Sequence, residues 1–308
     1  MKEISYNQSI KSKDLEGRGL SLSVKREDLL HPHISGNKFR KLKYNLEEAR
    51  KKGSTTLLTF GGAYSNHISA LSYAGKLNGF KTLGIIRGDE LAHDPEKVFT
   101  ENPTLRFARS NGMEFKFVSR AAYREKENPE FIESLISEFG DFYMVPEGGT
   151  NRLAVKGCEE ILSKDDASYD YICVSVGTGG TISGLINSAK TCQKVLGFQS
   201  LKGDFLEDSI RKNISGGKQW NLIKEYHFGG YAKINEKLIS FINDFYQQTT
   251  IPLDPVYTGK MMFGIMDLVK KDLFKSNSSI LAVHTGGIQG VEGMNQRLLK
   301  RNLPLIKI

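Results

Sequence analysis

The chain has 308 residues, 39% of them hydrophobic and 25% charged, which is enough apolar sequence for a large core and for two packed subdomains. Its formal net charge of +8 would suit an anionic partner, but lysines are interleaved with acids along most predicted helices, and no aromatic-basic module or zinc-ligand spacing accompanies them, which disfavours nucleic-acid binding. We expect a soluble, cytoplasmic protein with reduced thiols. The three cysteines are irregularly spaced, the N-terminus has no apolar signal segment, and no apolar run reaches membrane-spanning length.

Predicted strands and helices alternate along most of the chain after residues 1–24, which show little periodicity. The predicted strands are 55–60, 82–86, 114–118, 141–145, 169–176, 194–198 and 280–284. The predicted helices are 38–53, about 67–77, 96–110 with a break at Pro103, 129–139, one from Arg152, one from Thr181, 234–248, 260–271 and one after Gly287. This alternation indicates an α/β fold, and we expect two interleaved three-layer parallel-sheet subdomains with a ligand cleft at the C-terminal ends of their strands.

The stretch Ser35-Gly36-Asn37-Lys38 opens the first of these helices. The apolar residues that follow Lys38 at helical spacing are Leu42, Leu46 and Ala49. Lys38 therefore heads the inward face, whereas Arg40 and Lys41 are expected mostly around the other side. A buried ammonium is costly unless it is paired, deprotonated or covalently consumed. A lysine at a helix end can also bend outward to water, which is the more frequent case when only these residues are considered.

A glycine-rich turn, Gly177-Thr178-Gly179-Gly180-Thr181, follows an apolar strand and opens a helix. Such a turn presents several backbone N–H groups at the positive end of the helix, which suits a phosphate. A dinucleotide motif would need glycine in place of Ile182, and a Walker motif would need Lys-Ser or Lys-Thr after the glycines. A small phosphomonoester fits best, with a plain tight turn as the alternative.

Three further turns of this kind follow predicted strands. They are Gly61–His67, Pro146–Thr150 and His284–Gly287. In the first, backbone N–H groups with Ser65 and Asn66 can hold a substrate carboxylate, although either side chain can also be a plain helix N-cap. A lysine on an inward face, a phosphate cradle and a carboxylate site are together what pyridoxal phosphate chemistry requires.

The chain resembles the 1-aminocyclopropane-1-carboxylate deaminase/D-cysteine desulfhydrase family, a branch of the tryptophan-synthase-β-like (fold type II) pyridoxal phosphate enzymes. The matching motifs, in order, are Lys25–Leu29 with Gly36–Leu42, Tyr64–His67, Pro146–Asn151, Gly177–Thr181, Asp254–Lys260 and His284–Gly287. They span almost the whole chain. The resemblance implies a large cofactor-binding domain of residues 1–40 and 149–308, a small domain of residues 41–148, and a homodimer.

The resemblance also implies the residues that bind pyridoxal 5'-phosphate. Lys38 would be the Schiff-base lysine, and Asn66 would contact the hydroxyl of the ring. The residues implied to bind the phosphate are Gly177, Thr178, Gly179, Gly180 and Thr181. No metal is expected, because His31 and His33 have no carboxylate or cysteine at ligand spacing.

The implied substrate site lies on the other side of the cofactor. Ser65, with the backbone of Asn66 and His67, would receive the carboxylate of a small amino acid. Tyr257, and with it Tyr231, would face the substrate from the large domain. Ser65 and Tyr257 would also position the leaving group or assist proton transfer. Without the motif, Tyr257 is equally well a packed tyrosine with a paired hydroxyl.

Two threonines favour one branch of this family. Deaminases of the family have a glutamate directly after the tyrosine that corresponds to Tyr257, whereas this chain has Thr258 there. Thr285 would offer a hydroxyl to the pyridine nitrogen of the cofactor, as in D-cysteine desulfhydrases. A threonine hydroxyl stabilises a protonated ring less than a carboxylate does, so the electron sink should be weaker. A weaker sink favours α,β-elimination over opening a cyclopropane ring.

The expected reaction is therefore conversion of D-cysteine to pyruvate, ammonia and sulfide, with Lys38 removing the Cα proton. The alternatives are ring-opening deamination of 1-aminocyclopropane-1-carboxylate to 2-oxobutanoate, and another elimination or replacement substrate such as D-serine, a chloro-amino acid or an S-conjugate. A non-catalytic pyridoxal phosphate-binding or amino-acid-binding protein is a further alternative. It is disfavoured because a retained lysine with its positioning partners usually serves chemistry.

Overall fold

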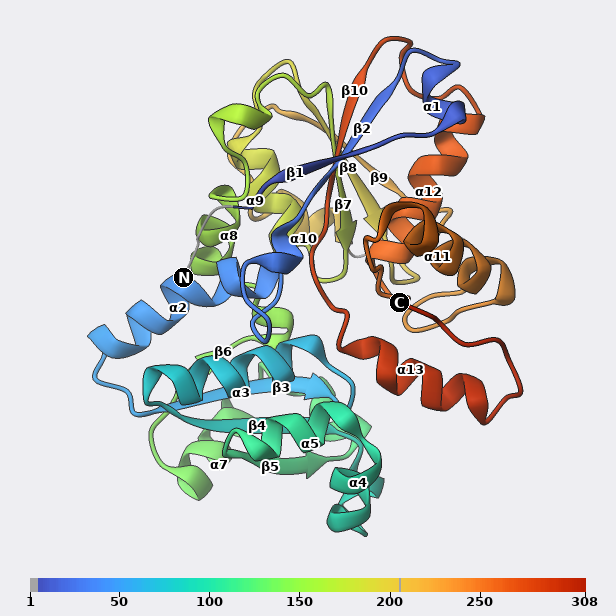
Figure 1. Ribbon diagram of the computed structural model, residues 1–308. Coiled ribbons are helices and arrows are strands. Elements are labelled where there is room, and N and C mark those ends of the chain that lie inside the picture. The colour runs from blue at the N-terminus through green and yellow to red at the C-terminus, as the bar shows by residue number, and fades with distance from the viewer. Residues whose placement is uncertain (1–4, 205) are drawn as a thin grey trace.

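The computed structural model describes residues 5–204 and 206–308, which fold around two β-sheets (Figure 1). Residues 1–4, part of the segment in which no signal sequence is expected, lie outside the described residues. In spatial order, the larger sheet contains β1 (Asn7–Ile10), β2 (Ser21–Lys25), β10 (Ser279–Val283), β7 (Tyr171–Val176), β8 (Lys194–Gln199) and β9 (Gln219–Ile223). The smaller sheet contains β5 (Met113–Val118), β4 (Lys81–Arg87), β3 (Thr56–Gly62) and β6 (Tyr143–Val145). All neighbouring strands are parallel except β1 and β2.

Helices cover both faces of the larger sheet. One face packs against α8 (Arg152–Glu159), α9 (Gly180–Ser188) and α10 (Leu206–Arg211). The other packs against α1 (Lys13–Glu16), α11 (Glu236–Thr249), α12 (Thr258–Lys270) and α13 (Gly290–Leu299). Strand β7 supplies both cores, because Ile172 and Val174 point to one face and Cys173 to the other. A sheet buried on both faces accounts for the nearly continuous apolar run in this strand.

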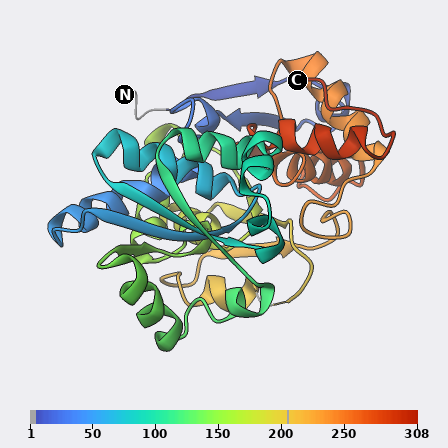
Figure 2. The same cartoon turned by 90° about the horizontal axis from the view of Figure 1, so that it is seen from below.

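The smaller sheet is layered in the same way. One face packs against α2 (Asn37–Lys51), α3 (Asn66–Asn78) and α5 (Pro103–Ser110), and the other against α6 (Arg120–Arg124) and α7 (Pro129–Phe139). Seen from below, its strands run between α3 and α5 on one side and α7 on the other (Figure 2). Helix α4 (Pro95–Glu101) ends at the predicted break, and α5 begins at Pro103. The chain thus has two interleaved three-layer α/β subdomains, as predicted.

Residues 5–24 are more regular than predicted. Within Ser21–Lys25, Leu22 and Val24 are fully buried and alternate with serines, so β2 is an ordinary strand between β1 and β10. The sequence interpretation also missed β9 and α10, which are short and mix polar with apolar residues. The larger sheet uses strands from 7–25 and 171–283 and the smaller from 56–145, whereas the boundaries at residues 40 and 148 stay a prediction.

Helix α2 is buried on two sides, which corrects the expectation for Arg40 and Lys41. These side chains are only 5% and 2% exposed. Helix α8 covers them: a Cβ on Gly157 would lie 2.0 Å from the Arg40 carbonyl oxygen, so the two helices are in close contact. The apolar periodicity of α2 marks only the face toward the small subdomain, and polar side chains fill the second buried face.

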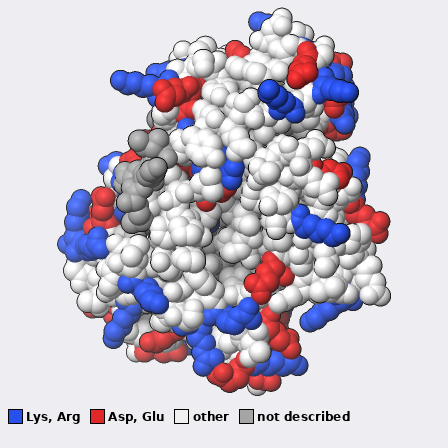
Figure 3. Space-filling view, in the orientation of Figure 1, with Lys and Arg blue, Asp and Glu red and all other residues white. Residues whose placement is uncertain are grey.

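The surface carries both signs of charge. In the orientation of Figure 1, lysine and arginine side chains are interspersed with acidic ones over the visible face (Figure 3). Within residues 5–204 and 206–308, the helices are all too short or too polar to cross a bilayer. Cys158 and Cys173 are buried free thiols, and Cys192 is an exposed one.

Candidate active site

A cavity of about 310 Å³ lies where strands of both sheets end. It is lined by Gly62 and Arg87 at the ends of β3 and β4, and by Ser175 and Val176 at the end of β7. Every residue predicted for the site lines it except Gly180, which is buried beside it. The cleft at the C-terminal ends of the strands is therefore where the sequence predicted it.

Lys38 points into this cavity from the first turn of α2. Its ammonium nitrogen donates to the carbonyl oxygen of Gly148 at 3.0 Å. Burial, and then the positive charge of Lys41, hold the pKa of Lys38 well below its ordinary value. Gly36 permits this placement, since its φ of 60° is left-handed and a Cβ there would lie 2.0 Å from the Thr285 carbonyl oxygen. Lys38 is thus an inward-facing lysine that readily becomes an uncharged amine, not one that bends outward to water.

A second lysine and two threonines adjoin the glycine-rich turn. The ammonium of Lys41 donates to Thr150 Oγ1 at 2.9 Å, and that hydroxyl lies 2.6 Å from Thr178 Oγ1. Helix α9 begins directly after Gly179, whose φ is 86°, and no side chain caps the first N–H groups of α9. Uncapped N–H groups, hydroxyls and an ammonium in one place fit a phosphate well.

The turn before α3 has the geometry of an N-cap. Ser65 Oγ accepts the backbone N–H groups of His67 and Ile68 at 3.3 and 3.4 Å. These two groups are therefore already partnered, and the Ser65 hydroxyl proton and the Asn66 N–H are the donors left at this turn for a carboxylate. The N-cap interpretation and the carboxylate interpretation are compatible, because the cap uses the oxygen of Ser65 and not its proton.

The His67 side chain is buried in the cavity wall as a neutral imidazole. Thr59 Oγ1 donates to the Val145 carbonyl oxygen at 2.7 Å, so Nε2 of His67 must donate to Thr59 Oγ1 at 2.9 Å. Nδ1 then has a lone pair without a hydrogen-bond partner among the described residues. Burial, followed by the charges of Lys38 and Lys41, lowers the pKa of His67 well below its ordinary value.

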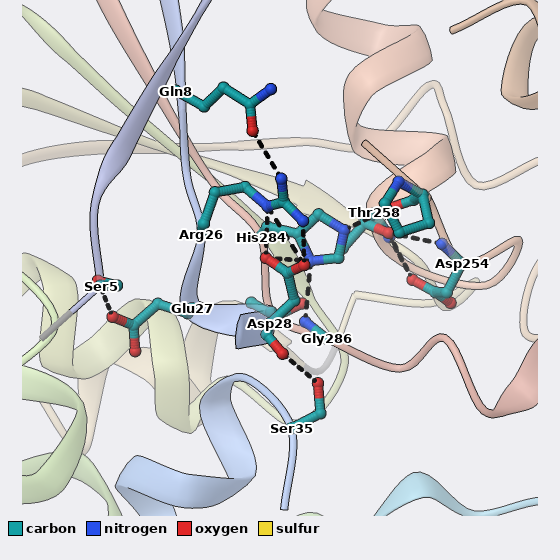
Figure 4. A network of polar contacts seen from close by, with 12 residues as sticks. Ser5, Gln8, Arg26, Glu27, Asp28, Ser35, Asp254, Thr258, His284 and Gly286 are labelled. Atoms are coloured by element: carbon teal, nitrogen blue, oxygen red, sulfur yellow. Dashed lines mark hydrogen bonds and ion pairs between the residues drawn. The ribbon is translucent and has the colours of Figure 1, made fainter. Parts of the chain in front are cut away.

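Thr285 and Ser175 also line the cavity, with their hydroxyl oxygens 3.1 Å apart. Figure 4 shows how the turn that carries Thr285 is fixed: His284 Nδ1 accepts the Gly286 N–H at 3.2 Å and Nε2 donates to the Pro252 carbonyl oxygen at 2.6 Å. The turn also touches the small subdomain, because a Cβ on Gly287 would lie 2.8 Å from the Asn66 side chain. The hydroxyl predicted to face the ring nitrogen is therefore held on a buried support.

Thr258 has a different place from Thr285. Its hydroxyl donates to Asp254 Oδ1 at 2.8 Å and accepts the Asp254 N–H at 2.9 Å, and it does not line the cavity. Tyr257 does line it, next to Tyr231, with ring centroids 6.4 Å apart. Burial raises the pKa of Tyr257 well above its ordinary value, so its phenol keeps its proton and can donate it.

Cavity residues that the sequence analysis did not assign to the site include Lys41, Arg87, Glu147 and Ser175. Lys41 follows Lys38 by three residues, a spacing that places both on one side of a helix, and this signal was available. Arg87 and Ser175 lie near the ends of β4 and β7, outside the glycine motifs, whereas Glu147 lies within the predicted turn Pro146–Thr150. Within the described part of the chain, no cluster of histidine, cysteine and acidic side chains could hold a metal, and His31 Nδ1 accepts two backbone N–H groups.

Removing the charge of Lys41 should raise the pKa of Lys38. The variant Lys41→Gln relieves the like-charge repulsion but leaves the burial, so the pH above which the Lys38 amine is free moves upward. The rate at which an arylating reagent modifies Lys38, followed by peptide mass spectrometry across a pH series, measures this shift. Lys156→Gln, on α8 above the ring of Tyr44, is the control and should leave the profile unchanged. An unchanged pH profile in Lys41→Gln would contradict the claim that the charge of Lys41 lowers the pKa of Lys38.

Known proteins resemble the chain over nearly its full length. Residues 4–286 match the family model described as pyridoxal-phosphate dependent enzyme. A Thermotoga maritima protein that carries the name of 1-aminocyclopropane-1-carboxylate deaminase is 32% identical, with 92% of this chain and 94% of that protein covered. The Arabidopsis thaliana bifunctional D-cysteine desulfhydrase/1-aminocyclopropane-1-carboxylate deaminase is 30% identical over 89% of this chain and 74% of its own length.

A solved structure extends the likeness to three dimensions. The crystal structure of an ACC deaminase homologue superposes with a TM-score of 0.80 at 27% identity, covering 96% of this chain and 93% of the other. The residues present fit pyridoxal phosphate, because three kinds of group surround one cavity. They are Lys38 with its lowered pKa, the uncapped start of α9 with Lys41 and its threonine neighbours, and the hydroxyl pair of Ser175 and Thr285. The chain therefore belongs to the pyridoxal-phosphate dependent enzyme family.

Proposed function

We propose that the protein is a lyase that converts D-cysteine to pyruvate, ammonia and sulfide by α,β-elimination. The observation that carries this proposal is the placement of the two threonines. Thr285 lines the cavity with Ser175, whereas the Thr258 hydroxyl is held by Asp254. Hydroxyls and not a carboxylate thus stand where the ring nitrogen is expected, which suits loss of a good leaving group.

The chain's own residues divide the work at the cavity. When bound, pyridoxal phosphate supplies an electron sink for the bonds at Cα. Lys38 would hold the cofactor through its aldehyde, and its amine, with a lowered pKa, would then accept the Cα proton. Asn66 would bond the ring hydroxyl. Lys41 and residues 177–181 would bind the phosphate, which keeps the reacting carbon near Lys38.

The substrate side follows the same logic. The Ser65 hydroxyl and the Asn66 N–H at the start of α3 would bind the carboxylate of the amino acid, whereas the predicted His67 N–H is already bonded to Ser65 Oγ. The phenol of Tyr257 keeps its proton and would donate it to the departing sulfur, with Tyr231 beside it at the cavity wall. The products balance: the Cα–H and Cβ–S bonds break, sulfide leaves, and the released aminoacrylate takes up water to give pyruvate and ammonia.

Ring-opening deamination is the second candidate. The Thermotoga maritima relative carries that name at 32% identity, against 25% for the D-cysteine desulfhydrase of Klebsiella pneumoniae, and the Arabidopsis thaliana relative carries both names. Overall identity does not select between the reactions, because the choice depends on the few groups around the ring. Assembly as a homodimer in the cytoplasm stays a prediction, to be tested by light scattering and by localisation in the source cell.

Product analysis tests the proposal. Protein loaded with pyridoxal phosphate is supplied with D-cysteine, L-cysteine or 1-aminocyclopropane-1-carboxylate, and keto acids and sulfide are measured. We expect pyruvate and sulfide in equal amounts from D-cysteine, with a kcat/KM at least ~10-fold above that for ring opening, the discrimination that ~1.4 kcal/mol of transition-state stabilisation gives. Dominant 2-oxobutanoate would contradict the interpretation of Thr285, and stable cofactor binding without any turnover would identify a non-catalytic protein.

A further inference from the structure

Arg87 brings a positive charge into the cavity that the proposed chemistry does not use. It is the last residue of β4, its backbone lies opposite Gly62 in the ladder between β3 and β4, and its side chain lines the cavity. The guanidinium is near the turn assigned to the substrate, because a Cβ on Gly62 would be 3.9 Å from Arg87 Nη2. Arg87 therefore lies on the small-subdomain side, which also carries Ser65.

The Arg87 side chain is exposed, and no acidic side chain of the described residues forms an ion pair with it. Across residues 5–204 and 206–308, the guanidinium makes no hydrogen bond or ion pair, and its contact is with the ring face of Tyr123, 5.6 Å from the centroid. Glu147 is the acid that lines the cavity, and it pairs with Lys126 at 3.4 Å. A guanidinium held over an aromatic ring keeps all its N–H donors at the edge, free for a planar anion.

The other charges of the cavity already have partners in the proposed function. Lys41 faces the phosphate turn, and Lys38 has a lowered pKa and acts as an amine. The carboxylate at Cα has the Ser65 hydroxyl and the start of α3. One permanent cation, Arg87, is left over at the substrate end. Because arginine binds carboxylate and phosphate groups through two parallel hydrogen bonds, a second anion on the substrate would complete this site.

We propose that Arg87 binds a negative charge on the β-substituent of the substrate, so that the enzyme prefers D-cysteine conjugates whose sulfur carries an acidic group. This inference rests on the proposed function. The step is the same elimination: the Cα–H and Cβ–S bonds break, the Cα proton goes to Lys38, the departing sulfur takes the proton of Tyr257, and the thiol leaves with its acidic group on Arg87. The released aminoacrylate again takes up water to give pyruvate and ammonia.

Two probes of the same shape isolate the charge. S-carboxymethyl-D-cysteine carries a carboxylate where S-carbamoylmethyl-D-cysteine carries a neutral amide. With the wild-type protein, kcat/KM should be larger for the carboxylate. In Arg87→Gln the ratio of the two values should fall by ~10- to ~100-fold, the range expected for a charge-assisted hydrogen bond, and Arg87→Lys should restore part of it. Arg106→Gln, which removes an exposed arginine that pairs with Glu292, is the matched control.

The ratio separates the outcomes. If Arg87 served the carboxylate at Cα, both substrates would suffer equally and the ratio would not change, which would overturn the inference. An unchanged ratio without loss on either substrate would overturn it too. If neither conjugate nor D-cysteine yields pyruvate, the proposed function fails separately. In that case the affinities of the two conjugates are measured by calorimetry with cofactor-loaded protein. The ratio of the carboxylate affinity to the amide affinity should again be larger in the wild type than in Arg87→Gln.

Discussion

Replacing Lys38 with alanine should reduce pyruvate formation by roughly 10⁴-fold or more, the size of loss seen when a covalent nucleophile is removed from an enzyme. The reason is that one amine has two tasks, holding the cofactor and taking the Cα proton. Lys38 alone combines a place in the cavity, a lowered pKa and the first turn of α2. Pyruvate released from D-cysteine, assayed with saturating pyridoxal phosphate, measures the loss.

The loss should be chemical and not structural. Lys38 makes one side-chain hydrogen bond, to the Gly148 carbonyl oxygen, and borders a cavity, so its removal should leave thermal unfolding almost unchanged. Lys51→Ala, at the exposed end of the same helix, is the matched control and should retain full activity. A Lys38→Ala protein with more than a tenth of the normal activity would show that another group does this work.

Replacing Glu27 with alanine should cost about 3–5 kcal/mol of unfolding free energy, which is typical for removing one partner of a buried ion pair. Glu27 is fully buried, accepts two hydrogen bonds from the Arg40 guanidinium at 2.9 and 3.1 Å, and accepts the Ser5 hydroxyl at 2.5 Å. Without it, Arg40 keeps its charge on a buried face of α2 and loses both of these short hydrogen bonds, while Glu160 lies at 4.0 Å. Urea unfolding followed by circular dichroism measures the change.

An exposed ion pair on α2, the helix that carries Arg40, provides the comparison. Glu48 and Lys52 approach to 3.7 Å at the surface, and Glu48→Ala should cost no more than about 0.5 kcal/mol. A Glu27→Ala protein as stable as Glu48→Ala would mean that this buried pair contributes no more than a surface one. Because Glu27 lies between β2 and α2, the loss should also weaken cofactor binding at Lys38.

The parts of the site that sequence predicted are those set by local rules. A glycine-rich turn after a buried strand, such as 177–181, has its geometry written in adjacent residues, and parallel strands bring several such turns to one edge. Lys38, Ser65 and Thr285 therefore meet around one cavity, as the motifs indicated. The cofactor followed from the same residues, because few other ligands need a lysine, a phosphate turn and a carboxylate turn together.

The remainder depends on contacts between distant segments. Arg40 and Lys41 are buried because α8 covers a face of α2 that is polar in sequence, and their partners include Glu27 and Thr150. Thr258 is the residue from which the sequence analysis argued against a deaminase, and that interpretation stays a prediction, but its bond to Asp254 depends on the fold of that loop. Hydrophobic periodicity identifies an apolar face, and it carries no information about a second face buried through ion pairs and hydrogen bonds.

One measurement tests the central claim that Lys38 is the cofactor lysine. The protein is loaded with pyridoxal phosphate, reduced with borohydride and digested, and the phosphopyridoxyl group is located by mass spectrometry. We expect a yellow protein whose colour disappears on reduction, with the label on Lys38. Lys41 is the competing site, since it is buried three residues further along the same helix. Label on Lys41, or a protein that binds no cofactor covalently, would contradict the account.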